Sequence, residues 1–379
     1  IGFTGTDNQG LAGIELKWDD VLTGTSGKVV RTTDVNNKEI SSDSQQYIEV
    51  QNGSNLYLTI DVNIQSIVEK YLKQAVDENS ASYGTAIMMN PETGEILSMA
   101  TYPDYDLNNP FEPNETLSKN WYNLSTEDQS SKLSEMWINR NVSTPYEPGS
   151  TFKVLMSSIA LEEDITEVEI ANDFYCKGYE DISGTKIRCW KNSHGSETLK
   201  KALANSCNPA FMQLGKRIGI EKLYKYFKAF GLFEKTGIET ASEASSIFFK
   251  EEDVGSVELA TLSFGQRFKI TPIQLVTAIS AVANDGKLVQ PRIIKQIVNT
   301  DTGSISNNDT IEVRQVISPE TANAVCKMME YVVTDGTGKY GAVTGYSIGG
   351  KTGTSEPAPN SNDGYTLSYV AISPVEDPK

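Results

Sequence analysis

A serine and a lysine in this chain have a spacing that supports nucleophilic chemistry. Ser150 and Lys153 follow residues 145–149, a stretch stiffened by two prolines and a glycine. Residues 154–161 are apolar nearly all round, which is typical of a buried helix. A helix that begins at or just before Ser150 places the hydroxyl and the amine one turn apart on one face. Because burial lowers the pKa of a lysine, Lys153 is a candidate base for activating Ser150.

Two further polar motifs follow in an order that suits a single cleft. Ser206 and Asn208 fall between two predicted helices, where a loop can aim a hydroxyl and an amide at a ligand. Lys351 lies on a predicted strand among glycines that let another backbone approach closely. Each motif also recurs by spacing alone, at residues 183–186, 306–308 and 235–237. The order and context of the three motifs together, rather than any one of them, indicate serine chemistry.

A second cluster of reactive side chains surrounds the single histidine, His194. Cys176 and Cys189 precede it in a polar, glycine-containing segment with little apolar material to fold it. We predict a structural zinc site with these three ligands and Asp173 as the fourth, and we expect Cys207 to pack behind the active-site loop. A Cys176–Cys189 disulfide and free thiols are the alternatives. A disulfide, however, gives no reason for the histidine to be there.

The predicted elements divide the chain into an accessory part and a catalytic part. Residues 1–55 are polar and carry only short β-like runs, which indicates a non-catalytic, β-rich module. Residues 56–379 begin with a strand at 56–60 and a helix capped by Asp61. A hairpin is predicted at 84–100 around a turn at 90–94. Helices are predicted at 197–204, 209–218, 221–230, 272–283 and 319–333, and strands at 342–348, 349–354 and 366–372.

Composition and charge exclude several classes of partner. The chain has 379 residues, 38% of them hydrophobic, and a formal net charge of -17. This is enough apolar material for a globular core, whereas the charge disfavours nucleic acid and anionic membrane surfaces. No stretch is long and apolar enough to span a bilayer. Because the chain opens at Ile1 without a methionine, we expect that an upstream segment has been removed.

With these motifs in place, the chain resembles the penicillin-binding proteins and the related serine β-lactamases. Residues 57–61 with Gln65, and residues 147–149, 271–274 and 283–286, are similar to class B penicillin-binding proteins, the monofunctional transpeptidases. The cysteines and His194 resemble the Gram-positive subgroup that includes the sporulation-specific enzymes. The resemblance implies an α+β fold with a five-stranded antiparallel sheet flanked by helices. Residues 1–55 would be the remnant of an N-terminal pedestal, and the catalytic domain would be truncated at its C-terminus.

The resemblance also implies a reaction and a setting. Ser150 would attack the D-Ala-D-Ala carbonyl of a peptidoglycan stem peptide, and an amine from a neighbouring strand would resolve the acyl-enzyme into a crosslink. β-Lactam antibiotics would acylate the same serine, and catalysis would need no cofactor. The protein would act at the extracytoplasmic face of the bacterial membrane, anchored by an N-terminal segment missing from this chain. A glycan polymerase would be its partner in elongation, division or sporulation.

Residue roles follow from the same resemblance. Lys153 would be the general base, Ser206 a proton relay toward the leaving nitrogen, and Asn208 a contact for the substrate backbone. The backbone N–H groups of Ser150 and Thr354 would form the oxyanion hole.

The third motif would bind the substrate. Lys351, Thr352 and Thr354 would hold its terminal carboxylate. Gly353 would keep the strand edge open, so that the substrate could add as a β-strand. Without the other two motifs, Lys351 could instead be an ordinary solvated strand lysine.

Other functions of the same fold remain as alternatives. A β-lactamase needs a base that activates water, and the sequence shows no mark of one. A D,D-carboxypeptidase and a β-lactam sensor are closer rivals. A catalytically silent cell-wall scaffold is disfavoured, because the serines, the asparagine and the lysines of all three motifs are present.

Overall fold

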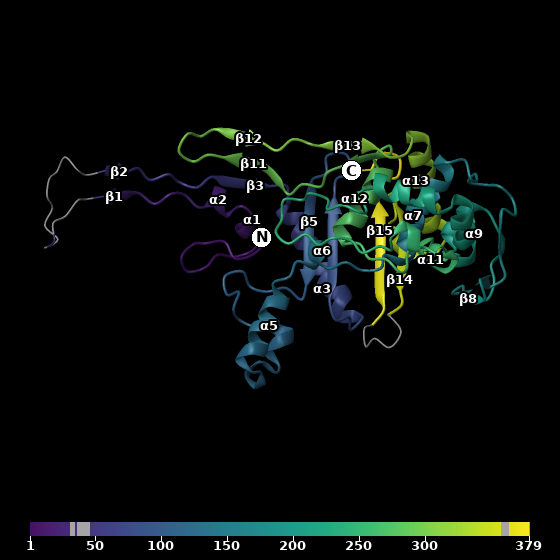
Figure 1. Ribbon diagram of the computed structural model, residues 1–379, viewed down its shortest axis with the longest axis horizontal. Helices are drawn as coiled ribbons and strands as arrows, with labels where there is room; N and C mark the ends of the chain where they lie inside the picture. Colours follow the sequence, from purple (N-terminus) through teal and green to yellow (C-terminus); the bar gives the residue numbers. More distant parts are fainter. Residues whose placement is uncertain (31–34, 36–45, 358–363, 379) are drawn as a thin grey trace.

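The computed structural model describes residues 1–30, 35, 46–357 and 364–378. A long arm of strands projects from a larger unit in which helices surround short sheets (Figure 1). The arm contains strands from residues 1–55, which were predicted to be an accessory part. The arm, however, also contains strands from much later in the chain.

The arm is built from two distant stretches of sequence. Its N-terminal part contains α1 (Gly13–Lys17), α2 (Asp19–Leu22) and the antiparallel pair β1 (Lys28–Val30) and β2 (Gln46–Ile48). The strand β3 (Asn55–Leu58) pairs with β11 (Ile294–Val298), which also pairs with β12 (Ile305–Asn307). The late hairpin thus extends the arm alongside the N-terminal residues (Figure 1).

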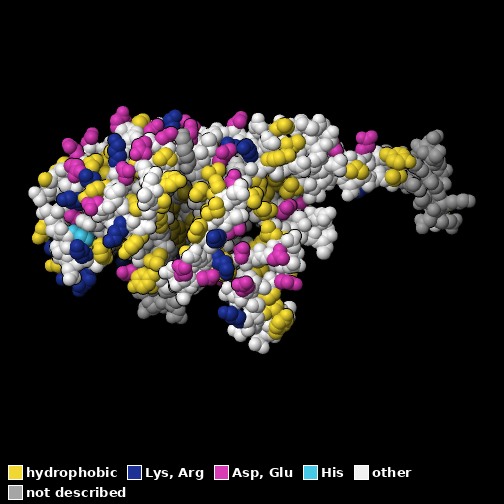
Figure 2. Space-filling model, turned by 180° about the vertical axis from the view of Figure 1, so that it is seen from behind, with side chains coloured by type: hydrophobic (Ala, Val, Ile, Leu, Met, Phe, Trp, Pro, Cys, Tyr) yellow, Lys and Arg dark blue, Asp and Glu magenta, His cyan; other side chains and the backbone are white. Residues whose placement is uncertain are grey.

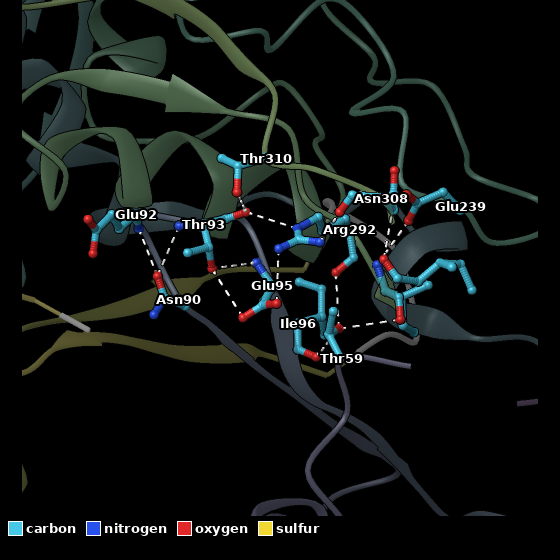
Figure 3. A network of polar contacts seen from close by, with 12 residues as sticks. Thr59, Asn90, Glu92, Thr93, Glu95, Ile96, Glu239, Arg292, Asn308 and Thr310 are labelled. Carbon is cyan, nitrogen blue, oxygen red and sulfur yellow. Dashed lines mark hydrogen bonds and ion pairs between the residues drawn. The ribbon is translucent and has the colours of Figure 1, made fainter. Parts of the chain in front are cut away.

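A polar network fastens the base of the arm to the larger unit (Figure 3). The Arg292 guanidinium donates from Nη2 to Glu95 Oε1 at 2.9 Å and from Nε to the Thr93 carbonyl at 3.2 Å, and it also contacts the Asn308 carbonyl. The Asn308 amide in turn donates to Glu239 Oε1 at 2.6 Å. Because the Arg292–Glu95 ion pair is largely buried, it holds the late hairpin in a defined position.

The first elements of the larger unit match the sequence prediction. The helix α3 (Val62–Glu78) begins after Asp61, whose carboxylate accepts the N–H groups of Asn63 and Ile64 at 2.8 and 3.0 Å. The predicted hairpin forms as β4 (Gly84–Met89) and β5 (Ile96–Tyr102). Local capping and turn chemistry was therefore enough to place these elements.

The expected five-stranded sheet is represented by two separate antiparallel pairs in the described residues. One is β4–β5, and the other is β14 (Gly349–Ser355) with β15 (Thr366–Ile372). The strand predicted at 342–348 is wrong. A single 3₁₀ turn, η5 (Lys339–Gly341), is followed by turns, and Gly345 has a φ of +88° that no strand adopts.

Helices pack around a central helix, α7 (Lys153–Glu162), which follows a 3₁₀ turn, η3 (Gly149–Phe152). Phe152, Leu155, Met156 and Ile159 of these two elements are fully buried, as their apolar run predicts. The other long helices are α9 (Asn208–Ile218), α10 (Ile220–Ala229), α12 (Pro272–Val282) and α13 (Pro319–Asp335), with the shorter α8 (Leu199–Ala204) and α11 (Ser256–Leu262). All five predicted helices are confirmed, with ends shifted by at most a few residues.

Most of the remaining elements are short. They are α4 (Glu115–Ser118), α5 (Thr126–Met136), α6 (Arg140–Ser143), η2 (Trp121–Asn123), η4 (Glu251–Asp253), β6 (Phe174–Cys176), β7 (Tyr179–Ile182), β8 (Thr185–Arg188), β9 (Gly195–Glu197), β10 (Lys287–Val289) and β13 (Glu312–Gln315). The strands β6 to β9 form two small hairpin-like pairs beside α9.

The distribution of charge on the surface agrees with the exclusion of nucleic acid as a partner. On the face shown in Figure 2, lysines and arginines are interspersed with aspartates and glutamates rather than gathered into one basic patch. Nucleic-acid binding needs such a patch. Within the described ranges, no helix has the length and apolarity that a membrane crossing requires.

Candidate active site

The candidate nucleophile lies in the turn that leads into the central helix. Ser150 is half-buried in η3, and Lys153 is the first residue of α7. Side chains three residues apart eclipse each other in a 3₁₀ turn, so both face the same way. The turn packs tightly against β14: Gly149 has a φ of +56°, and a Cβ there would lie 2.7 Å from the Thr354 carbonyl oxygen. Only glycine fits this approach.

The Lys153 amine is fully buried and is bound by the second motif. Its Nζ donates to Asn208 Oδ1 at 2.7 Å and to the carbonyl oxygen of Ser206 at 2.9 Å, and it lies 3.4 Å from Ser206 Oγ. Burial lowers the pKa of Lys153 to about 8, against an opposing effect of nearby Cys207. About a tenth of the amine is therefore unprotonated at pH 7, far more than for a lysine in water, and this form can act as a general base.

Ser206 occupies a strained position at the end of α8. Its φ is +52°, in the left-handed region where a helix usually ends on glycine. The Ser206 N–H donates to the Leu203 carbonyl at 3.1 Å and the Cys207 N–H to the Ala202 carbonyl at 2.9 Å, which is the Schellman pattern. A non-glycine residue in this conformation costs about 1–3 kcal/mol and persists only where the surrounding structure holds it.

The third motif meets the second at the same hydroxyl. Lys351 is fully buried on β14, and its Nζ donates to Ser206 Oγ at 3.0 Å and to the Thr352 carbonyl at 2.8 Å. Burial, together with the nearby charge of Lys153, holds the pKa of Lys351 well below its ordinary value. The alternative of a solvated strand lysine is therefore wrong. Thr352 is half-buried, whereas Thr354 is exposed.

The structure also separates the three motifs from their chance copies. Ser183 and Lys186 are both exposed on the β7–β8 hairpin. Ser306 is exposed on the arm, and Lys235 is exposed in a loop. In the described residues no hydrogen bond joins one of these copies to another, whereas the motifs chosen from order and context meet at Ser206.

Lys351→Ala is expected to lower the second-order rate of acylation by a penicillin at least tenfold, about 1.4 kcal/mol of transition-state stabilisation. The buried amine donates to Ser206 Oγ, so within the described residues its removal leaves that hydroxyl in contact with Lys153 alone. Lys235→Ala, in the exposed copy of the motif, is the control and should leave the rate unchanged. Time-resolved intact-mass measurement gives the rate, and equal rates for the two variants would contradict the assignment.

The cysteine cluster forms beside the second motif. The ligand atoms of Cys176, Cys189, His194 and Cys207 lie within 4.8 Å of one another, and Cys189 Sγ is 3.7 Å from His194 Nδ1. A hydrogen bond from Cys207 lowers the pKa of the Cys189 thiol to about 4 and raises that of Cys207 itself. All four cysteines of the chain are free, so the alternative Cys176–Cys189 disulfide is not formed.

The prediction of Asp173 as the fourth ligand is wrong. Asp173 Oδ1 accepts a hydrogen bond from Arg217 Nη1 at 2.7 Å, and its other oxygen contacts Thr166. Cys207 takes its place in the cluster. Arg217, far along the chain, could not be paired with Asp173 from local spacing. The position of Cys207 at the N-cap of α9, directly after Ser206, was the available signal.

Comparison with known proteins agrees with this geometry. Residues 84–379 match the family described as the penicillin binding protein transpeptidase domain, and residues 1–58 match the penicillin-binding protein dimerisation domain. The chain is 38% identical to stage V sporulation protein D of Bacillus subtilis (strain 168), over 100% of this chain and 56% of that protein. It is 29% identical to PbpB of Mycolicibacterium smegmatis over 100% of this chain and 57% of that one.

Solved structures show the same fold. Penicillin binding protein 3 of Mycobacterium tuberculosis, in its apo form, superposes with a TM-score of 0.83 at 27% identity, covering 100% of this chain and 79% of that one. The same protein complexed with aztreonam gives a TM-score of 0.81 at 27% identity, with the same coverage. The chain spans slightly more than half the length of the curated relatives it matches, 56% of the first. It belongs to the penicillin-binding protein transpeptidase family, in the class B group that carries the dimerisation domain.

Proposed function

We propose that this protein is a serine D,D-transpeptidase that crosslinks peptidoglycan stem peptides and is acylated by β-lactams. The observation that carries the proposal is the convergence of Lys153 and Lys351 on Ser206, beside the turn that holds Ser150. Relatives named peptidoglycan D,D-transpeptidase, 27–31% identical to this chain, support it.

The proposed acylation step uses groups that are already in place. Ser150 Oγ attacks the carbonyl of the penultimate D-alanine while Lys153 accepts its proton. Ser206 passes a proton to the leaving nitrogen, which departs with D-alanine, and Asn208 contacts the substrate backbone. The backbone N–H groups of Ser150 and Thr354 stabilise the oxyanion, an effect worth about 10²- to 10³-fold per donor.

Substrate binding is assigned to the open side of β14. The exposed side chain of Thr354, together with Lys351 and Thr352, would hold the terminal carboxylate. At Gly353 a Cβ would lie 2.3 Å from Ser368 Oγ and 2.9 Å from the Pro148 carbonyl. A side chain there would push β14 away from the turn that carries Ser150, so glycine keeps the two in contact.

The test of this function is intact-mass measurement after incubation with benzylpenicillin, with and without a chase. One adduct that persists for minutes to hours supports a transpeptidase, whereas rapid turnover of a chromogenic cephalosporin would indicate a β-lactamase. Incubation with a D-Ala-D-Ala peptide and a D-amino acid acceptor separates the remaining alternatives. Exchange into the acceptor indicates a transpeptidase, and hydrolysis alone indicates a carboxypeptidase.

We also propose that Cys176, Cys189, His194 and Cys207 bind a structural zinc ion. Three thiols and one imidazole are a donor set typical of closed zinc sites, with Zn–S near 2.3 Å and Zn–N near 2.0–2.1 Å. Nε2 of His194 is buried without a hydrogen-bond partner in the described structure, and Nδ1 of the same ring lies 3.7 Å from Cys189 Sγ, so a buried ring nitrogen is free to bind a metal ion beside the thiols. Since Cys207 directly follows Ser206, zinc would brace the second motif.

Removal of zinc is expected to lower both the melting temperature and the acylation rate, because metal-binding free energy contributes to folding. Metal content should be measured on protein purified under reducing conditions without chelator, and the melting temperature before and after chelation. Cys326→Ser, a substitution of the cysteine outside the cluster, is the control and should retain its metal. The proposal would be contradicted if the purified protein contained no stoichiometric zinc, or if chelation left its melting temperature unchanged.

The accessory part is assigned a supporting role. We propose that residues 1–55 are a non-catalytic pedestal and residues 56–379 the transpeptidase domain. The match of residues 1–58 to a dimerisation domain supports this division. A glycan polymerase is the proposed partner, at the extracytoplasmic face of the membrane and with an N-terminal anchor outside this chain. Similarity to a sporulation protein favours a role in sporulation over one in elongation or division.

A further inference from the structure

The left-handed conformation of Ser206 needs support from outside its own helix. The two hydrogen bonds of the Schellman pattern are also formed when glycine ends a helix, so they do not by themselves offset the strain of a serine. The hydroxyl must nevertheless stay 3.0 Å from Lys351 Nζ. A residue in such a conformation persists only where several contacts from the surrounding structure hold it in place. The amines of Lys153 and Lys351 hold the carbonyl and the hydroxyl of Ser206 directly, and the neighbouring loop supplies further contacts to the residue before it.

Those contacts converge on Asn205, the residue immediately before Ser206. Its side-chain Nδ2 donates to Glu197 Oε1 at 2.8 Å, and its backbone carbonyl accepts from the Trp190 indole Nε1 at 2.9 Å. Asn205 is thus held at its side chain and at its main chain at once. The hydrogen bond from Trp190 to the Asn205 carbonyl matters most for Ser206, because this carbonyl belongs to the peptide group that carries the Ser206 N–H.

Glu197 is an unusual anchor for a loop. It ends β9, and it is only 2% exposed, beside a fully buried Cys207. Carboxyl groups are rarely buried so completely unless they are paired or hydrogen-bonded, since they lose their hydration. The Asn205 amide is the hydrogen-bond donor that the structure supplies to Oε1. A leucine would fill this space without that cost, so the side-chain oxygen at this position indicates a role beyond packing.

We propose that Glu197 and Trp190 are positioning residues for Ser206, acting through Asn205. Neither residue belongs to the three motifs. Together they fix the peptide before Ser206 and so keep its hydroxyl between the amines of Lys153 and Lys351. The inference rests on the proposed acyl-transfer function. Loss of this support should lower the rate of the chemical step without changing how tightly the β-lactam is first bound.

The test compares Glu197→Leu, which removes the acceptor, with Glu197→Gln, which keeps a carbonyl oxygen for Asn205. For each variant the acylation rate constant and the dissociation constant of the pre-acylation complex are measured with benzylpenicillin. We expect Glu197→Leu to lose at least about tenfold in the rate constant with an unchanged dissociation constant, and Glu197→Gln to recover most of that loss. Glu243→Leu, which removes another buried carboxylate that holds the Thr236 turn, is the matched control.

Two further measurements keep the result decisive. Trp190→Phe removes only the indole donor of a side chain that is 63% exposed, so it should fold normally and still slow acylation by about threefold or more. Hydrogen exchange of the amides at 205–208 should increase in Glu197→Leu and not in Glu197→Gln, whether or not the protein reacts with penicillin. Wild-type protein that is not acylated would refute the proposed function. Acylated wild-type protein with unchanged rates and exchange in Glu197→Leu and Trp190→Phe would refute this inference alone.

Discussion

Ser150→Ala is expected to abolish covalent labelling by benzylpenicillin, while the wild-type protein gains one adduct. The hydroxyl of Ser150 lies in the turn that leads into the buried helix bearing Lys153. The amine of Lys153 contacts Ser206 and Asn208, and the amine of Lys351 contacts Ser206. Ser206, the other serine of the motifs, is only 7% exposed and is held between two amines, whereas Ser150 is half-buried, so we expect the β-lactam to react with Ser150. Intact-mass spectrometry of both proteins under the same conditions measures the effect.

The control for this substitution is built into the chain. Ser183→Ala changes the serine of the exposed copy of the motif and should leave labelling complete. Both variants replace one serine with alanine. A difference in labelling between them therefore depends on where the serine lies in the structure and not on the loss of a hydroxyl group as such. An adduct that persists in Ser150→Ala would overturn the assignment, and peptide mapping of that adduct would then locate the true nucleophile.

The acylation rate is expected to rise about tenfold per pH unit below the pKa of its base and to level off above it. Burial lowers the pKa of Lys153 to about 8. Since only the unprotonated amine can accept the proton of Ser150, the rate should climb from pH 6 to about 8 and then reach a plateau. Rate constants measured across this range with a penicillin that does not itself titrate there provide the test.

Lys153→Met should lower the acylation rate by about 10²- to 10⁴-fold and remove the rise with pH, because the general base is lost. Methionine has a similar length and is tolerated in a core, so the helix should still pack. Lys186→Met, at an exposed lysine with the same spacing from a serine, should change neither the rate nor the profile. A Lys153→Met variant that kept the wild-type profile would assign the base to another group.

Features that depend on near neighbours in the chain were predictable from the sequence. Asp61 caps α3 through N–H groups two and three residues away, and Thr271 with Gln274 forms a capping box at the start of α12. The spacing of Ser150 and Lys153 is likewise local, because one helical turn fixes it. The hairpin β4–β5 needed only its turn residues and its apolar runs.

Features that depend on distant contacts were decided by the tertiary structure alone. Lys153 and Lys351 meet at Ser206 although the separations are 53 and 145 residues, and Arg217 binds Asp173 across 44 residues. The order of the motifs suggested that Lys153, Ser206 and Lys351 share one site, but not the geometry of that site. It gave no sign of the contact between Arg217 and Asp173. Local spacing in the sequence therefore identified the reactive side chains. The packing of the core decided which of them share a hydrogen bond, because residues far apart in the chain can be in contact once the core has formed.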